Sequence, residues 1–180
     1  KIFYRDLKVD SAPAFRFQHL WNGGPHAPDI DTYTILIALP ITFDDSVHII
    51  EQMITCTDEK SLKTMCFLVK PHPTMPEDIL IKNFGSRWPR SLHFTDLDTL
   101  IVLRKSNILV SSMSSISLEA MALGIPVLVV DQSRGLQYNA IPHELDQDLW
   151  KQCSSNQDII DGIKLFRERD EKELARHHQL

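Results

Sequence analysis

The chain contains 180 residues, of which 43% are hydrophobic and 24% are charged. This composition is that of an ordinary globular protein, so it excludes an intrinsically disordered chain, a collagen-like repeat and a coiled coil. The net charge of −5 gives the chain no general attraction for phosphate backbones, so we expect no nucleic acid partner.

No apolar stretch approaches the roughly 20 residues that a membrane-spanning helix needs, and the first residues show no signal-peptide pattern. We therefore expect a soluble cytoplasmic protein with at most peripheral contact at the inner face of a membrane. Cys56, Cys66 and Cys153 are scattered without a C-x-x-C pair, which supports neither a disulfide framework nor a structural zinc site. Because the chain starts at Lys1 rather than Met, we expect it to be part of a longer protein.

Residues 1–30 contain several prolines and glycines and show little periodicity, which predicts a connector or the remains of an upstream domain. Residues 31–180 are predicted to form one domain. Its first strand, at residues 33–39, is a near-continuous run of β-branched and aliphatic side chains that ends at Pro40. Such a run is typical of a strand that is buried on both faces.

Helices and strands then alternate along the chain. Capping-box spacings predict helix starts at Thr42/Asp45, Thr74/Glu77, Thr95/Asp98 and Ser155/Asp158. Another helix is predicted over residues 114–123, with Gly124 placed for a left-handed cap. The last helix is expected to bury Ile159, Ile163 and Phe166. Further strands are predicted at residues 65–69, 92–95, 108–110 and 127–130, and a polar loop at residues 131–154.

This alternation predicts an α/β fold, a Rossmann-like doubly wound parallel sheet of about five strands in the order 3-2-1-4-5. In such sheets a ligand binds at the carboxyl ends of the strands, beside the point where the strand order reverses. That point lies next to the first strand, between the second and the fourth. The loops that follow these strands are therefore the place to look for a site.

The segment from Lys70 to Pro73 (KPHP) follows the second strand. Lys70 and His72 each precede a proline, which holds their backbone extended. Since residues two apart in an extended segment face the same way, the ammonium and the imidazole are expected to project together as an anion clamp. The alternative is a rigid turn in which His72 only caps backbone groups.

Four serines occur among the five residues 111–115, directly between the fourth strand and a helix. Hydroxyls and free amide groups at the start of a helix can bind a phosphate, for which Ser112, Ser114 and Ser115 are candidates. The alternative is that the serines only cap the helix. This segment and the KPHP segment are expected to stand about 10 Å apart, two strand spacings, and to close on one phosphate.

Three acidic residues are further candidates. Glu119 is the lone charge on an otherwise apolar helix, and its spacing from Ser115 does not fit a capping box, so it is either a ligand contact or a partly exposed face. Asp96 and Asp98 follow the third strand, where a carboxylate can accept hydrogen bonds from ribose hydroxyls, although Asp98 also fits a helix cap. No histidine or acidic spacing predicts a metal site, and classical nucleotide motifs and a nucleophile elbow are absent.

The KPHP segment, followed by residues 114–127 (SSISLEAMALGIPV), resembles the C-terminal, donor-binding half of GT-B glycosyltransferases. The resemblance covers residues 33–130. It is to enzymes with an HP motif and a later serine motif, namely bacterial sialyltransferases, polysialyltransferases and capsule Kdo transferases that use CMP-activated sugars. It implies a nucleotide-sugar-binding domain at residues 31–180 that acts in surface polysaccharide or lipooligosaccharide synthesis.

By this resemblance His72 is the catalytic residue, which contacts the CMP phosphate of the donor. Ser114 and Ser115 would bind the same phosphate with help from Lys70, and Asp96 or Asp98 would hold the ribose. The nucleotide-binding set implied in full is Lys70, His72, Pro73, Asp96, Asp98, Ser112, Ser114, Ser115 and Glu119.

The implied reaction is inverting, metal-independent glycosyl transfer from a nucleotide-sugar donor to a glycan or glycolipid acceptor, with no further cofactor. In the sialyltransferases the general base lies in an acidic D/E-D/E-G motif of an N-terminal domain, and Asp44-Asp45-Ser46 does not match it. We therefore expect the base in a missing N-terminal acceptor domain, and little or no turnover by this chain alone. A CDP-glycerol-type glycerophosphotransferase and a non-catalytic flavodoxin-like regulatory module are the alternative functions.

Overall fold

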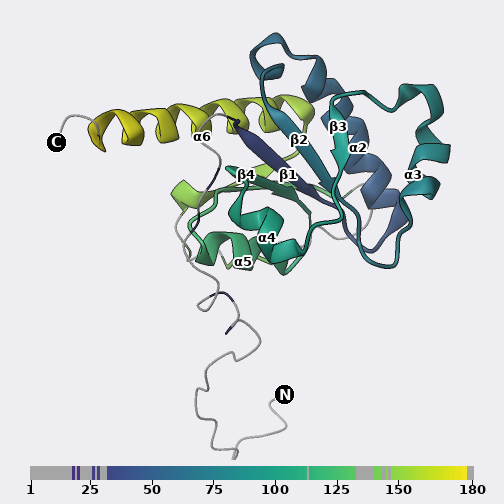
Figure 1. Cartoon of the computed structure of the whole chain (residues 1–180), viewed down its shortest axis with the longest axis horizontal. Helices are drawn as coiled ribbons and strands as arrows, with labels where there is room; N and C mark the ends of the chain where they lie inside the picture. Colours follow the sequence, from purple (N-terminus) through teal and green to yellow (C-terminus); the bar gives the residue numbers. More distant parts are fainter. Residues whose placement is uncertain are drawn as a thin grey trace, which may run out of the picture.

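A parallel β-sheet forms the centre of the computed structural model (Figure 1). The structure describes residues 18, 20, 26, 28, 32–112, 114–132, 140–142, 145 and 147–177. Within them six strands form one sheet in the order β3-β2-β1-β4-β5-β6. The strands are β1 (Thr34–Ala38), β2 (Cys66–Lys70), β3 (Leu92–Phe94), β4 (Ile108–Ser111), β5 (Val127–Val130) and β6 (Trp150–Cys153).

The predicted α/β class and the order of the first five strands are confirmed, but the polar loop predicted over residues 131–154 is wrong at its end. Residues Trp150–Cys153 form β6, which pairs in parallel with β5. Strand β6 lies at the edge of the sheet, and only its first and last residues are buried. It therefore lacks the continuous apolar run that reveals the central strands.

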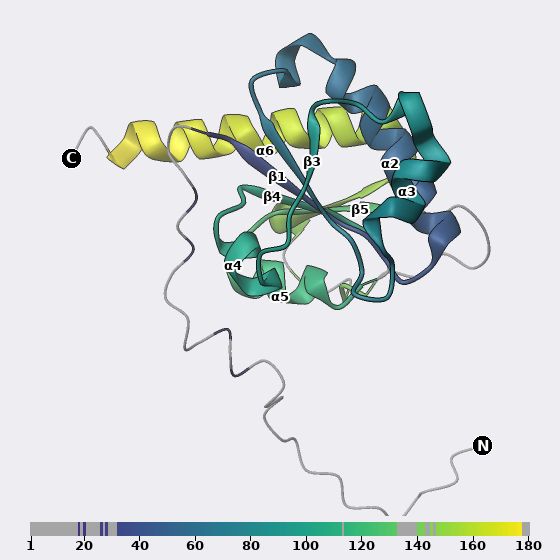
Figure 2. The same cartoon turned by 45° about the vertical axis from the view of Figure 1, so that its right-hand side comes forward.

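The helices form a layer on each face of the sheet. Figure 2 shows α2 and α6 on one side and α4 and α5 on the other. The helices are α2 (Phe43–Asp58), α3 (Glu77–Phe84), α4 (Thr99–Arg104), α5 (Ile116–Ala122) and α6 (Asn156–His177). Short 3-10 turns are η2 (Lys60–Leu62), η3 (Gly85–Arg87) and η4 (Gln147–Leu149). Within the described residues, no helix is both long enough and apolar enough to cross a membrane.

Each face of the sheet has its own hydrophobic core, and β1 contributes to both. Ile35 and Ile37 belong to the core that also holds side chains of α2, α3 and α6. Leu36 and Ala38 belong to the opposite core, with side chains of α4 and α5. Because neighbouring strand residues point to opposite faces, a strand that is covered on both sides must be apolar throughout.

The predicted helix starts at Thr42 and Ser155 are confirmed, since α2 begins directly after Thr42 and α6 directly after Ser155. Helix α4 begins after Asp98 rather than after Thr95. Asp98 caps α4 by accepting a hydrogen bond from the amide of Leu100. Thr42 stands at the N-cap of α2, and its hydroxyl donates to the carboxylate of Asp45 but makes no capping hydrogen bond with the backbone. The N-cap of α3 is Pro76 rather than Thr74.

The start of α6 is a complete capping box. The amide of Asp158 donates to the hydroxyl of Ser155 at 3.2 Å, and the amide of Ser155 donates to the carboxylate of Asp158 at 3.0 Å. The predicted inner face is also confirmed, since Ile159, Ile163 and Phe166 are buried. These hydrogen bonds satisfy donors that a helix start otherwise leaves open.

The capping box predicts a pH dependence of stability. Hydrogen bonds from the Ser155 hydroxyl and the Ser154 amide hold the pKa of Asp158 below its ordinary value. The stabilisation is therefore complete above the ordinary pKa of aspartate and is lost as the pH falls through the lowered value. We expect Asp158→Asn to remove this acid-side decrease when the free energy of unfolding is measured between neutral and acidic pH. Asp78→Asn, at an exposed position of α3, should keep it, and equal profiles for both variants would contradict the assignment.

Gly124 provides the left-handed cap that follows α5, as predicted. Gly124 has a φ of 76°, its amide donates to Met121, and the amide of Ile125 donates to Ala120. This pair of hydrogen bonds is a Schellman motif, which requires a left-handed residue at this position.

Gly124→Ala is expected to lower the free energy of unfolding by about 1–2 kcal/mol, because a Cβ is strained in the left-handed region. A Cβ at Gly124 would meet no atom within 4 Å, so the loss would report backbone strain alone. Urea denaturation measures it. Gly124→Asn should cost less, since asparagine tolerates this conformation, and equal losses for both variants would contradict the explanation.

The three cysteines are free thiols. Cys56 of α2 and Cys153 of β6 are both fully buried, and burial raises the pKa of each thiol to about 12. The thiol of Cys56 lies 3.6 Å from the carbonyl oxygen of Asn156, at the start of α6. Cys66 is half-buried.

Most of the predicted connector at residues 1–30 lies outside the described residues. Two described parts of it contact the domain near the end of α4. The carbonyl of Leu20 accepts a hydrogen bond from Arg104 at 2.8 Å, and the Nε2 atom of His26 lies 2.7 Å from the carbonyl oxygen of Ser106. The predicted boundary between the connector and the domain stays a prediction.

Candidate functional site

The carboxyl ends of β2, β1 and β4 meet at one edge of the sheet. Ala38 of β1 pairs with Lys70 of β2, and Ile37 pairs with Val110 of β4, so Ser111 is level with Ala38. Two strand spacings of about 4.8 Å each therefore separate the ends of β2 and β4. The KPHP loop (residues 70–73) and the serine loop (residues 111–115) thus flank β1 at the same edge, as the sequence predicts.

The residues at this edge face the α4 and α5 side of the sheet. Ala38 belongs to the core on that side, and paired residues of parallel strands point the same way, so Lys70 does as well. Ser111 has the same orientation, since its hydroxyl lies 2.8 Å from the hydroxyl of Ser117 in α5. Strands β2 and β4 therefore direct their last side chains to the same face of the sheet.

Lys70 does not extend freely from the end of β2. Its ammonium donates a hydrogen bond of 2.7 Å to the carbonyl of Leu97, in the loop between β3 and α4. One of the three donors of the ammonium is thus engaged, and two are left.

His72 is held by its own turn. The amide of Thr74 donates to the Nδ1 atom of His72 at 3.3 Å, and the hydroxyl of Thr74 lies 2.8 Å from the same atom. An Nδ1 atom that accepts a hydrogen bond carries no proton, so in the neutral ring the proton is on Nε2. The turn is therefore compatible with both interpretations of the sequence. His72 caps the amide of Thr74, as a rigid turn requires, and its ring is fixed so that Nε2–H can donate to an anion.

The serine loop divides into inner and outer hydroxyls. Ser112 is only 2% exposed, and its Oγ has no hydrogen-bond partner among the described residues. The Oγ of Ser114 accepts from the amide of Ile116 at 3.4 Å, which leaves its own proton free to donate. Ser115 is exposed and makes no capping hydrogen bond through its side chain.

The start of α5 offers fewer free amides than the sequence suggests. The amides of Ile116, Ser117 and Leu118 donate to the Ser114 hydroxyl, the Ser114 carbonyl and the Ser115 carbonyl, respectively. Helix α5 is also only seven residues long. A phosphate at this loop would therefore be bound by serine hydroxyls rather than by the amides of the first helical turn.

The acidic candidates occupy different settings. Asp98 is engaged as the cap of α4, as its alternative interpretation expects. Asp96 is exposed in the same loop. Glu119 is half-buried on α5. Pro73 is exposed in the KPHP loop and adds no hydrogen-bond donor to the site.

Asp131 lies at the same edge but is absent from the candidates that the sequence suggests. It directly follows β5, and its carboxylate accepts hydrogen bonds from Gln152 and, at 2.6 Å, from Ser154. Its position after a predicted strand is a sequence signal that could have identified it. Its partners could not be found that way, because they belong to the unpredicted strand β6 and the turn after it.

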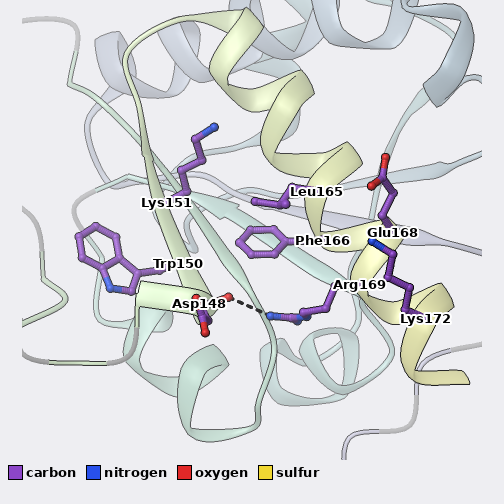
Figure 3. Close-up of a pocket in the computed structure, with 8 residues that line it drawn as sticks. All are labelled: Asp148, Trp150, Lys151, Leu165, Phe166, Glu168, Arg169 and Lys172. Carbon is purple, nitrogen blue, oxygen red and sulfur yellow. Dashed lines mark hydrogen bonds between the residues drawn. The ribbon is translucent and has the colours of Figure 1, made fainter. Parts of the chain in front are cut away.

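A pocket of about 450 Å³ lies away from these loops, between β6 and the second half of α6 (Figure 3). Trp150 is the first residue of β6, so the pocket is at the amino end of that strand. Arg169 donates to the backbone carbonyl of Asp148 at 2.8 Å and crosses one side of the pocket. The pocket therefore does not belong to the loops at the carboxyl ends. No group of three metal-ligating side chains occurs in the described part of the chain.

Comparisons with known proteins find similarity at the level of structure. No protein-family model matches the sequence, and no curated protein sequence is significantly similar to it. The C-terminal domain of the glycosyl transferase group 1 family protein LpcC from Francisella tularensis has a TM-score of 0.52 at 18% identity. The match covers 87% of this chain and 84% of that domain.

Two longer proteins share the same fold. TarM matches with a TM-score of 0.53 at 15% identity, over 78% of this chain and 30% of TarM. UDP-GlcNAc 2-epimerase from Neisseria meningitidis, bound to UDP-GlcNAc, matches with a TM-score of 0.51 at 18% identity, over 88% of this chain and 42% of the epimerase. This chain thus spans less than half the length of either protein. Its fold is the Rossmann-like fold of the C-terminal half of GT-B proteins, as the sequence predicts.

Proposed function

We propose that this chain is the donor-nucleotide-binding domain of a GT-B glycosyltransferase of surface carbohydrate synthesis, and that its donor is a CMP-activated sugar. The observation that carries the proposal is the position of the KPHP loop and the serine loop. They flank β1 at the carboxyl edge of the sheet, where parallel α/β sheets bind ligands. The fold shared with the C-terminal domain of LpcC supports the same class of function.

The donor phosphate would lie between the two loops. On one side the Nε2–H of His72 donates to it, with the ring fixed by Thr74. On the other side the hydroxyls of Ser114 and Ser115 donate, and Ser112 and Glu119 complete the loop and helix around the nucleotide.

The chemistry follows from where charge develops. As the bond between sugar and phosphate breaks, the leaving nucleotide gains negative charge on its phosphate. Fixed donors stabilise that developing charge more than they stabilise the intact donor, so they lower the barrier. In the proposed reaction His72 and the serines perform this role without a metal ion, and the transfer inverts the anomeric centre. The general base and the binding site for the glycan or glycolipid acceptor lie in a separate N-terminal domain. This chain alone is therefore expected to bind the donor without turnover.

Isothermal titration calorimetry with CMP, CDP, UMP and UDP tests the proposal. Heat of binding with CMP, and less with the uridine nucleotides, is the expected result. A UDP-linked donor is the second candidate, because the similar epimerase holds UDP-GlcNAc and the similar MnaA structure from S. aureus holds UDP. Tighter binding of UDP would favour that donor, and no heat with any of the four nucleotides would contradict the proposed function.

A further inference from the structure

We infer that Lys70 is a positioning residue that holds the loop between β3 and α4, so that Asp96 is presented to the ribose of the bound nucleotide. This inference rests on the proposed function and assigns Lys70 to the loop rather than to the phosphate. It also distinguishes Asp96 from Asp98 as the ribose ligand.

Lys70 contacts the loop between β3 and α4. Its ammonium donates to the carbonyl of Leu97 at 2.7 Å, across 27 positions of sequence. Lys70 is itself well anchored, since it is the last residue of β2, pairs with Ala38, and its carbonyl accepts from the amide of Leu39 at 3.0 Å. A hydrogen bond from a charged donor is about twice as strong as a neutral one. Lys70 therefore ties the β3–α4 loop to the centre of the sheet.

Hydrogen bonds also hold this loop on both sides of Asp96. The amide of Thr95 donates to the carbonyl of Val69 at 3.0 Å, and the amide of Leu97 donates to the Thr95 hydroxyl at 3.4 Å. After Leu97, the carboxylate of Asp98 accepts from the amide of Leu100 at 2.9 Å. Asp98 is thus committed to α4.

Asp96 lies in the middle of this loop. It is exposed, and no hydrogen bond or ion pair of its side chain is recorded among the described residues. Strand β3 is one strand spacing, about 4.8 Å, from β2. A ribose attached to a phosphate at His72 would therefore come within reach of Asp96. An ionised carboxylate accepts hydrogen bonds from two vicinal hydroxyls, and a loop that is already ordered loses less entropy on binding.

A pair of ligands separates this role from a phosphate contact. CMP and 2′,3′-dideoxy-CMP carry the same phosphate, but only CMP has ribose hydroxyls at both positions. Calorimetric titration of both ligands into Lys70→Met and Asp96→Asn is expected to show about tenfold weaker CMP binding and no more than a twofold change for the dideoxy ligand. Lys70→Arg should restore CMP binding, because a guanidinium can also donate to Leu97. Asp78→Asn, an exposed carboxylate on α3, is the matched control and should leave both affinities unchanged.

Each outcome decides a different question. Equal weakening of both ligands by Lys70→Met would overturn the inference in favour of a phosphate contact, and the proposed function would stand. Unchanged CMP binding by Asp96→Asn would also overturn the inference. This measurement does not depend on whether the Lys70 variant folds. Failure of the unmodified protein to bind either ligand would contradict the proposed function and the inference together.

Discussion

His72→Ala is expected to weaken CMP binding by about 1.5–3 kcal/mol, the range for a hydrogen bond to a charged group. His72 follows β2 in one of the two loops that flank β1, and Thr74 fixes its ring with Nδ1 as the acceptor. The remaining donor, Nε2–H, has no recorded partner among the described residues, so its loss costs a ligand contact rather than an internal one. Calorimetry with CMP measures the change.

His93→Ala is the matched control for this measurement. His93 lies on β3, is exposed, and has no recorded hydrogen bond among the described residues, so its removal should leave the affinity unchanged. If His72→Ala binds CMP as tightly as the unmodified protein, the KPHP loop is only a rigid turn. The turn interpretation also predicts a loss of stability for His72→Ala, because the Thr74 amide would lose its acceptor. Thermal unfolding of the same variant measures this structural role, and calorimetry with CMP measures the ligand contact.

Ile37→Ala is expected to lower the free energy of unfolding by about 2–5 kcal/mol, the range for a large buried aliphatic side chain replaced by alanine. Ile37 is fully buried in the middle of the sheet, paired with Val69 on one side and with Val110 on the other. Its side chain belongs to the core beneath α2 and α6. The neighbouring side chains are close-packed there and cannot move far enough to fill the cavity that alanine would leave. Urea denaturation followed by circular dichroism measures the loss.

Ile101→Ala provides the control of the same chemistry. Ile101 lies on α4 and is 48% exposed, so its truncation should change the free energy of unfolding by no more than about 0.5 kcal/mol. Similar losses at Ile37 and Ile101 would contradict the assignment of β1 to the centre of the sheet. Because β1 separates the two loops, a large loss at Ile37 should also weaken CMP binding near the unfolding midpoint.

The central strands could be predicted from sequence because double burial leaves a distinct pattern. Residues Thr34–Ala38 and Val127–Val130 are buried at every position, and their sequences are correspondingly apolar. The edge strand Trp150–Cys153 is different, since it pairs with another strand on one side only, and its two middle residues are polar and not buried. An edge strand is thus defined by the neighbour that it pairs with more than by its own residues.

The hydrogen bonds at helix starts could not be predicted in the same way. In the Ser155/Asp158 box the Ser155 hydroxyl accepts from the Asp158 amide and also donates to the Asp158 carboxylate, which accepts from the Ser155 amide as well. At Thr42 the hydroxyl donates to the carboxylate of Asp45 in the same way but accepts no capping hydrogen bond from a backbone amide. The spacing of the two residues is the same in both cases, so sequence alone does not decide which hydrogen bond forms.

The position of the candidate site was predictable, but the hydrogen bonds within it were not. Strand order places the two loops at one edge, and the order follows from topology rules. The partner of Lys70 is a backbone carbonyl 27 residues away, and the amides at the start of α5 are used within their own turn. Such contacts depend on tertiary geometry that no sequence spacing encodes.

The buried thiols of Cys56 and Cys153 can be used to measure local opening of the structure. Alkylating reagents attack the thiolate, which a pKa of about 12 makes rare for Cys56 and Cys153 in the closed state. Half-buried Cys66 is the more accessible of the three, so its modification supplies a reference on the same molecule. The slower labelling of Cys56 and Cys153 then reports how often the structure around them opens, and mass spectrometry can follow it with and without nucleotide.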